Sequence, residues 1–315
     1  MYEDAPVRGY TEPGGGTETA IRQPGKVLNP MILVTGAAGK TGQEVVRQIA
    51  ETGETVRAMV FRADQVDGIV GLGAHEALVG DLLGETSLVR FLDGVRAVYH
   101  ICPNVHPREV AIGKAVISAA LSAGVDHFVF HSVLYPDVEA MPHHWLKFKV
   151  EQQLKASRLP FTILRPCAYM QNLLPQIPQM AANGRLEVPY AVEAKLSVVD
   201  LRDVVAAAAK VLSESGHEGN TYELCGPAPI SHRRMARELE SVLGRPVEAV
   251  AIDPAEWEER ARSSGLGDYA IGALLKMFAW YDRNGFVGLS SDLERLLGRS
   301  AGSFVEFARR ASGRA

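Results

Sequence analysis

Residues 31–42 form a short apolar run that ends in three glycines spaced three residues apart. Gly36 allows a sharp turn after the run, Gly39 lets a phosphate approach the backbone, and Gly42 allows the next helix to pack closely. The first N–H groups and the dipole of that helix favour an anion. Because a strand-like run precedes the glycines and an amphipathic segment follows them, this pattern predicts a dinucleotide pyrophosphate site. The expected contacts are Gly36, Ala38, Gly39, Lys40, Thr41 and Gly42.

Strand-like and helix-like segments alternate after this motif. Strands are expected at residues 55–61, 76–79, 97–102, 127–131 and 161–164, and helices at 110–123 and 145–157. This alternation is typical of a parallel sheet with helices on both faces. We therefore predict an α/β, doubly wound Rossmann fold, in which the carboxyl ends of the strands meet at one edge and hold the ligand.

The regular alternation of strand-like and helix-like segments ends near residue 165. We expect a helix over 168–182 bent by its prolines, strands at 196–199 and 221–224, and a helix over 204–212 capped by Asp200. The rest is mostly helical, with one strand near 247–252. The predicted domains are a dinucleotide-binding domain, 31–165 with 196–225 contributing, and a smaller helical substrate lobe, 166–195 and 226–315. Residues 1–30 lack periodicity, which predicts a disordered extension or a start site upstream of a natural Met31.

Composition excludes several classes of protein. The net charge of −4 gives no reason to expect nucleic acid or an anionic membrane as a partner. No apolar run approaches the roughly 18 residues of a spanning helix. Cys102, Cys167 and Cys225 lack metal-ligand spacing and are typical of reduced cytosolic thiols. We therefore predict a cytoplasmic protein with a small-molecule substrate and no metal, and self-association as a homodimer is left open.

The residues after the second strand bear on the choice of cofactor. Enzymes that use NAD usually place a carboxylate here for the ribose 2′-hydroxyl, whereas this chain has Arg62. A guanidinium suits a 2′-phosphate, and Lys40 in the glycine loop could reach the same group. The sequence therefore favours NADP(H) over NAD(H). Asp64 would reverse this preference if its turn brought it back to the ribose.

Two further strand ends are expected to contact the cofactor. Asp81, followed by Leu82, could accept a hydrogen bond from the adenine amino group or could cap the next helix. Cys102 and Pro103 end the fourth strand and should pass close to the nicotinamide ribose.

Several segments together resemble the NmrA-like group of atypical short-chain dehydrogenases/reductases. They are residues 35–42, 57–62, 130–133, 143–151, 161–172, 199–204 and 222–227, of which the glycine motif and the stretch from Leu-Arg-Pro to Gln-Asn172 are the most specific. The resemblance runs from about Met31 to the C-terminus and implies a nucleotide-binding domain with a small C-terminal lobe. Members of the group are either NAD(P)H-dependent reductases, acting for example on quinones or azo dyes, or dinucleotide-binding redox sensors without obvious turnover.

Short-chain reductases generally use a Tyr-x-x-x-Lys pair, in which the lysine binds the nicotinamide ribose and lowers the pKa of the tyrosine. No tyrosine in this chain has a lysine four residues later, and the matching place holds His143-x-x-x-Lys147. One helical turn puts both side chains on one face. Lys147 could keep the ribose contact and His143 could donate the proton. Each role has its own alternative: His143 could only cap or pack, and Lys149 could take the place of Lys147.

Other polar residues are expected around the substrate. Ser132 ends the fifth strand and could bond the substrate oxygen or only satisfy the backbone. Tyr135 could act as the acid if its loop folds inward. Tyr169 and Asn172 should face the pocket from the smaller lobe, and Pro166 should lie near the nicotinamide carboxamide.

Three functions are compatible with these residues. The first is an NADP(H)-dependent reductase of a small carbonyl, quinone or imine, in which Lys147 orients the ribose and His143 or a bound water supplies the proton. The second is a non-catalytic, redox-sensing regulator that binds the dinucleotide, which the missing tyrosine favours. The third is a lyase or isomerase, such as an epimerase with bound NAD, and Arg62 argues against it.

Overall fold

The structure, a computed structural model, describes residues 30–313, so the predicted disordered extension lies, apart from Pro30, outside the described residues. Within that range the central sheet has seven strands in the order β11-β6-β5-β4-β1-β2-β3, and every neighbouring pair is parallel. The strands are β1 (Met31–Val34), β2 (Val56–Val60), β3 (Glu76–Val79), β4 (Val95–His100), β5 (His127–His131), β6 (Phe161–Pro166) and β11 (Asn220–Leu224).

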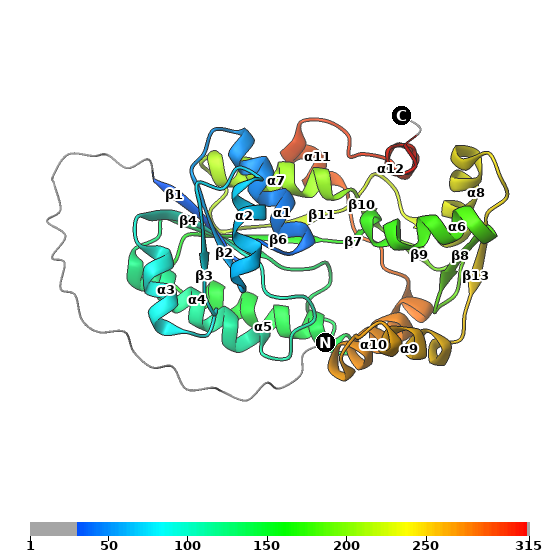
Figure 1. Cartoon of the computed structure of the whole chain (residues 1–315), viewed down its shortest axis with the longest axis horizontal. Coiled ribbons are helices and arrows are strands. Elements are labelled where there is room, and N and C mark those ends of the chain that lie inside the picture. The colour runs from blue at the N-terminus through cyan, green and yellow to red at the C-terminus, as the bar shows by residue number, and fades with distance from the viewer. Residues whose placement is uncertain (1–29, 314–315) are drawn as a thin grey trace, which may run out of the picture.

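Helices cover both faces of this sheet, as Figure 1 shows. One face carries α1 (Lys40–Glu51) and α7 (Leu201–Ser213), and the other carries α3 (Glu85–Leu92), α4 (Glu109–Ala123) and α5 (Pro142–Ala156). The short helix α2 (Val66–Val70), preceded by a 3₁₀ turn η1 (Ala63–Gln65), connects β2 to β3. The predicted doubly wound α/β fold is confirmed. The strand order reverses between β1 and β4, which is where such sheets bind ligands.

The core consists of two apolar layers, one on each side of the sheet. Ile32 and Val34 pack into the layer under α1 and α7, whereas Met31 and Leu33 pack into the layer under α3 to α5. Successive side chains of a strand point to opposite faces. Because both faces are buried, the strands read as continuous apolar runs, which is why the sequence revealed them.

The region after β6 differs most from expectation. The predicted helix over 168–182 is divided into β7 (Ala168–Tyr169), a 3₁₀ helix η2 (Met170–Gln176) and α6 (Ile177–Asn183). Pro175 lies inside η2, and Pro178 occupies the first turn of α6, where its missing N–H is tolerated. The prolines therefore break this segment.

The predicted strand at 196–199 is also divided. It forms β9 (Lys195–Leu196) and β10 (Val198–Val199), which pair with β12 (Ile230–Ser231) and β7, respectively. An unpredicted strand, β8 (Arg185–Val188), pairs with β13 (Glu248–Ala251). The remaining helices are α8 (His232–Leu243), α9 (Pro254–Ser263), α10 (Asp268–Asn284), α11 (Ser291–Leu297) and α12 (Phe304–Ala311).

These later elements lie beyond the carboxyl ends of the main strands. In Figure 1, α6, α8, α9 and α10 gather with β8 and β13 on that side, whereas α11 and α12 return toward α7. The predicted boundaries between a cofactor domain and a substrate lobe stay a prediction. None of the described helices is long and apolar enough to cross a membrane.

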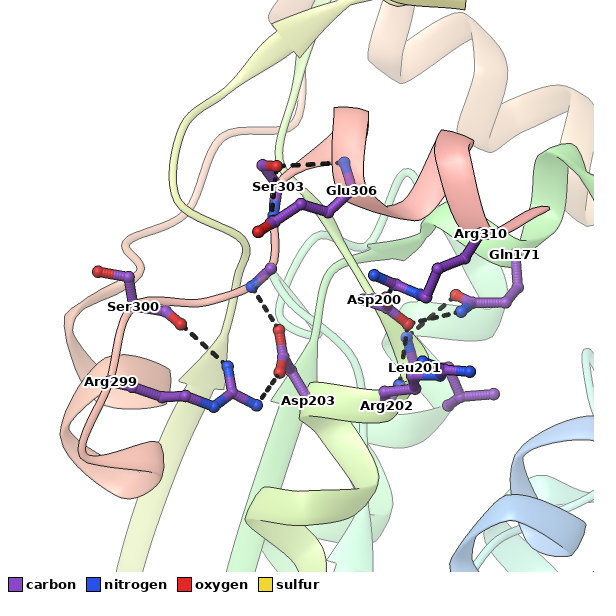
Figure 2. Close-up of polar contacts among 11 residues, drawn as sticks. Gln171, Asp200, Leu201, Arg202, Asp203, Arg299, Ser300, Ser303, Glu306 and Arg310 are labelled. Carbon is purple, nitrogen blue, oxygen red and sulfur yellow. Dashed lines mark hydrogen bonds and ion pairs between the residues drawn. The ribbon is translucent and has the colours of Figure 1, made fainter. Parts of the chain in front are cut away.

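Asp200 caps α7, as predicted, and also ties together two distant segments. Its Oδ1 accepts hydrogen bonds from the backbone N–H of Arg202 at 3.0 Å and from Nε2 of Gln171 at 2.7 Å. Its Oδ2 pairs with Arg310 of α12 (Figure 2). The carboxylate is only 2% exposed, so these partners replace its lost hydration.

Asp203, one turn later, makes a matching set of contacts to the C-terminal segment. It pairs with Nη2 of Arg299 at 2.6 Å and accepts the backbone N–H of Gly302 at 2.6 Å (Figure 2). The start of α7 thus joins η2 to the chain around α12. These contacts hold η2, the segment that follows β7, beside the edge of the sheet.

Candidate functional site

The glycine turn has the geometry that a bound pyrophosphate needs. Gly36 has a φ of +60°, and a Cβ there would lie 2.8 Å from the carbonyl oxygen of Ile101. A Cβ on Gly42 would lie 2.2 Å from the carbonyl oxygen of Gly36. The α1 helix has no side-chain cap on its N-terminus and no acidic residue in its first turn. Its first N–H groups and its dipole are therefore directed at an anion without internal competition.

Thr35 holds the ends of β1 and β4 together at the switch point. Its hydroxyl donates to the carbonyl oxygen of Ile101 at 3.1 Å, accepts the N–H of Ile101 at 3.0 Å, and lies 2.9 Å from Nδ1 of His100. The glycine turn and the loop after β4, which carries Cys102 and Pro103, therefore lie side by side. The Cys102 side chain is buried, whereas Pro103 is exposed to solvent.

The adenine end of the predicted site is exposed. Arg62 follows β2 and pairs with Asp64 at 3.0 Å, and their side chains are 60% and 68% exposed. Such a surface pair contributes at most about 1 kcal/mol, so a phosphate can compete for the guanidinium. Asp81 accepts the N–H of Leu83 at 2.9 Å and does not cap α3, whose N-cap is Gly84.

The two remaining predicted contacts near this end have different surroundings. Leu82 packs into the apolar layer under α3, so only its backbone is available to a cofactor. Lys40, the first residue of α1, is exposed.

Lys147 lies on α5 and forms a buried ion pair that the sequence did not reveal. Its Nζ is 2.8 Å from Oε1 of Glu109, the first residue of α4, and the two side chains are 13% and 1% exposed. Burial alone would lower the pKa of Lys147, but the attraction of Glu109 leaves it above its ordinary value. Burial and Glu109 both raise the pKa of the Cys102 thiol, which is therefore protonated. The only hint in the sequence was an acidic residue just after the strand-four loop.

His143 is the second residue of the same helix and is too buried to ionise readily. Its ring is 9% exposed, packs edge-on against His144, and its Nδ1 has no hydrogen-bond partner among the described residues. Burial, aided by His144 and Lys147, lowers its pKa to about 3. At neutral pH the ring is uncharged, so any proton that it gave would come from a neutral imidazole.

The hydroxyl of Ser132 is used inside the protein. It donates to Oε1 of Glu151 at 2.6 Å, and Arg165 binds both oxygens of that carboxylate at 2.9 and 2.5 Å. Glu151 is fully buried. The sequence suggested a substrate oxygen or the backbone as the partner of Ser132, and the structure shows a carboxylate.

Tyr135 connects the loop after β5 to the C-terminal region. It has a φ of +52°, its hydroxyl donates to the carbonyl oxygen of Val287, and its ring packs against Trp280 and Phe286. The phenol proton is thus occupied by a docking contact. The loop after β5 therefore contacts α10 and the segment that follows it.

Tyr169 is brought to the glycine loop. Its hydroxyl oxygen lies 2.6 Å from Nε2 of His131, and burial raises its pKa while a hydrogen bond with Thr41 opposes that rise. Pro166 is buried at the end of β6, where its carbonyl accepts the N–H of Leu134. Asn172 is exposed. Among the described residues no group of three His, Cys, Asp or Glu side chains is placed to hold a metal ion.

Comparison with known proteins agrees with this architecture. Residues 29–303 match the model of the NmrA-like family. The NAD(P)H azoreductase of Xenophilus azovorans is 32% identical over 281 residues, which cover 89% of this chain and 97% of that protein. The NADPH-dependent quinone oxidoreductase of Escherichia coli, solved with NADPH, superposes with a TM-score of 0.79 at 26% identity and covers 89% of this chain and 99% of its own.

A negative transcriptional regulator, NmrA, solved with NAD, has a TM-score of 0.71 at 19% identity, covering 89% of this chain and 94% of its own. This likeness shows a shared fold alone.

Proposed function

Since the chain belongs to the NmrA-like family, we propose that it is an NADP(H)-dependent reductase of a small carbonyl, quinone or imine substrate. The observation that carries this proposal is the start of α1, which has no side-chain cap and no acidic residue in its first turn and lies at a turn where a Cβ on Gly36 or Gly42 would overlap backbone atoms. It is supported by relatives named as an NAD(P)H azoreductase and as quinone oxidoreductase 2, and by a solved structure named as an NADPH-dependent quinone oxidoreductase.

Each part of the cofactor has candidate partners in this chain. The backbone of residues 36–42 would hold the pyrophosphate, Arg62 and Lys40 the 2′-phosphate, Asp81 and Leu82 the adenine, and Lys147 the nicotinamide ribose. Cys102, Pro103 and Pro166 would border the nicotinamide, which supplies hydride when bound. Tyr169 and Asn172 remain candidates on the substrate side, with His143 or water as the proton source. The hydroxyls of Ser132 and Tyr135 would first have to leave Glu151 and Val287, respectively.

Arg62→Ala is expected to lower the preference for NADPH over NADH about tenfold, because one charge-assisted contact to the 2′-phosphate is lost. The measurement is parallel calorimetric titration with both reduced cofactors. Asp64→Asn is the matched control. It frees the guanidinium from its partner at 3.0 Å and should leave or increase that preference. An unchanged ratio in Arg62→Ala would place the 2′-phosphate elsewhere.

The function itself is tested by mixing the purified protein with NADPH and a water-soluble benzoquinone, an azo dye or a cyclic imine, and following NADPH oxidation. We expect turnover with at least one acceptor. Tight binding of NADPH without turnover would instead support the second candidate, a redox-sensing dinucleotide-binding regulator. The missing tyrosine and the uncharged His143 favour that alternative. A cytoplasmic location and a homodimer remain predictions.

A further inference from the structure

The ring side chains of Tyr99, His131 and Tyr169 form a hydrogen-bonded series from the buried middle of the sheet to the glycine loop, where Tyr169 is half-buried. The hydroxyl of Tyr99, on β4, lies 2.7 Å from Nδ1 of His131, on β5. Nε2 of His131 lies 2.6 Å from the hydroxyl of Tyr169, on β7. Tyr99 is fully buried and His131 is 6% exposed. Tyr169 in turn contacts Thr41, the second residue of α1.

The two hydrogen bonds of Tyr99, His131 and Tyr169 have one favourable donor-to-acceptor direction. The imidazole of His131 is uncharged, because burial lowers its pKa to about 3, so it carries one donor and one acceptor. Among the described residues the Tyr99 hydroxyl has no other hydrogen-bond partner. If it accepted from Nδ1, its own proton would be buried without an acceptor, which is unfavourable. The satisfied arrangement has Tyr99 donating to Nδ1 and Nε2–H donating to Tyr169.

This direction of the hydrogen bonds leaves Tyr169 with a proton that it can donate. Its oxygen already accepts from His131, and the contact with Thr41 opposes the rise in its pKa that burial causes, as a donor to that oxygen does. Neither residue therefore accepts the proton of Tyr169. Burial raises the pKa of Tyr169, so the phenol keeps this proton at neutral pH. The hydroxyl is thus a neutral donor with a fixed orientation, and it lies just after the carboxyl end of β6.

We propose that Tyr169 donates a hydrogen bond to the oxygen or nitrogen atom of the substrate on which negative charge develops during reduction, and that His131 and Tyr99 position it. This rests on the proposed reductase function. The substrate gains hydride with its electron pair, and a fixed O–H donor stabilises the resulting charge. Water supplies the proton that completes the reduction, so Tyr169 remains a phenol throughout. It would replace the donor that the Tyr-x-x-x-Lys tyrosine provides in short-chain reductases.

The first test compares kcat and the dissociation constant of NADPH among three phenylalanine variants. Tyr169→Phe should lower kcat about 100-fold, as the loss of an oxyanion donor does, without weakening NADPH binding. Tyr99→Phe, remote from the site, should lower kcat about tenfold because His131 is then free to adopt either tautomer. The control is Tyr222→Phe, which removes a similar Tyr–His hydrogen bond (3.0 Å to Nδ1 of His217) on β11 and should leave kcat unchanged.

The second test determines which ring nitrogen of His131 carries the proton, and it does not depend on turnover. Nitrogen NMR of His131 should show an unprotonated Nδ1 and a protonated Nε2 in the wild type, and a mixture in Tyr99→Phe. The opposite tautomer in the wild type would overturn the proposal. So would full kcat in Tyr169→Phe, or a loss confined to NADPH binding, which would make the cofactor the acceptor. Wild-type protein that turns over none of the acceptors would refute the reductase function itself.

Discussion

Gly42→Ala is expected to weaken dinucleotide binding at least 100-fold and to destabilise the fold. The added Cβ would lie 2.2 Å from the carbonyl oxygen of Gly36 and 2.7 Å from Cα of Ala37. Both are backbone atoms of the glycine turn, so no rotamer change can relieve the overlap, and α1 must move away from β1. Such overpacking costs about 1 to 3 kcal/mol, and the displaced N–H groups no longer converge on a phosphate.

The measurements are calorimetric titration with NADPH, where we expect at least a 100-fold loss of affinity, and denaturant unfolding. Gly68→Ala is the matched control, because it lies in α2 with nothing within 4 Å of the added Cβ. It should leave stability unchanged or slightly raised, since alanine is the better helix former. If Gly42→Ala bound NADPH normally, the cofactor could not lie in this turn.

Lys147→Met is expected to have the second largest effect, on both stability and activity. Glu109, 1% exposed, would lose the counter-charge now 2.8 Å away. Leaving one buried charge unpaired lowers the free energy of unfolding by about 3 to 5 kcal/mol. The proposed ribose contact would be lost as well, so kcat/KM for NADPH should fall at least 100-fold.

A double-mutant cycle separates these two roles. Adding Glu109→Gln to Lys147→Met removes the uncompensated charge, so stability should largely recover while activity does not. Lys149→Met, two residues along the same helix, is the control: Lys149 is exposed, and its Nζ lies 5.7 Å from the centroid of the Trp145 ring. Full activity in Lys147→Met with loss in Lys149→Met would assign the ribose contact to Lys149.

The ion pair with Glu109 keeps Lys147 charged on a helix, α5, that carries no tyrosine. In the Tyr-x-x-x-Lys arrangement both groups come from one helix. Here Lys147 is held from α4 by Glu109, and the donor that we propose comes from β7, a separate element that follows β6. The position that the sequence offered for a donor, His143, is uncharged at neutral pH.

The sequence by itself determined the fold class, the glycine turn and the place of most strands. These follow from local patterns: continuous apolar runs for strands buried on both faces, glycines where a Cβ would meet backbone, and an aspartate at a helix start. The pattern failed after β6, where prolines broke the expected helix and strands of two residues carried too little periodicity to detect.

Only the tertiary structure decided which polar groups meet. Lys147 and Glu109 are 38 residues apart, as are His131 and Tyr169, and each pair joins separate elements at the sheet edge. The partner of Ser132 was likewise hidden, because Glu151 reaches it from α5. Hydrogen-bond partners and burial depend on how whole elements pack, and residue spacing along the chain does not encode that packing.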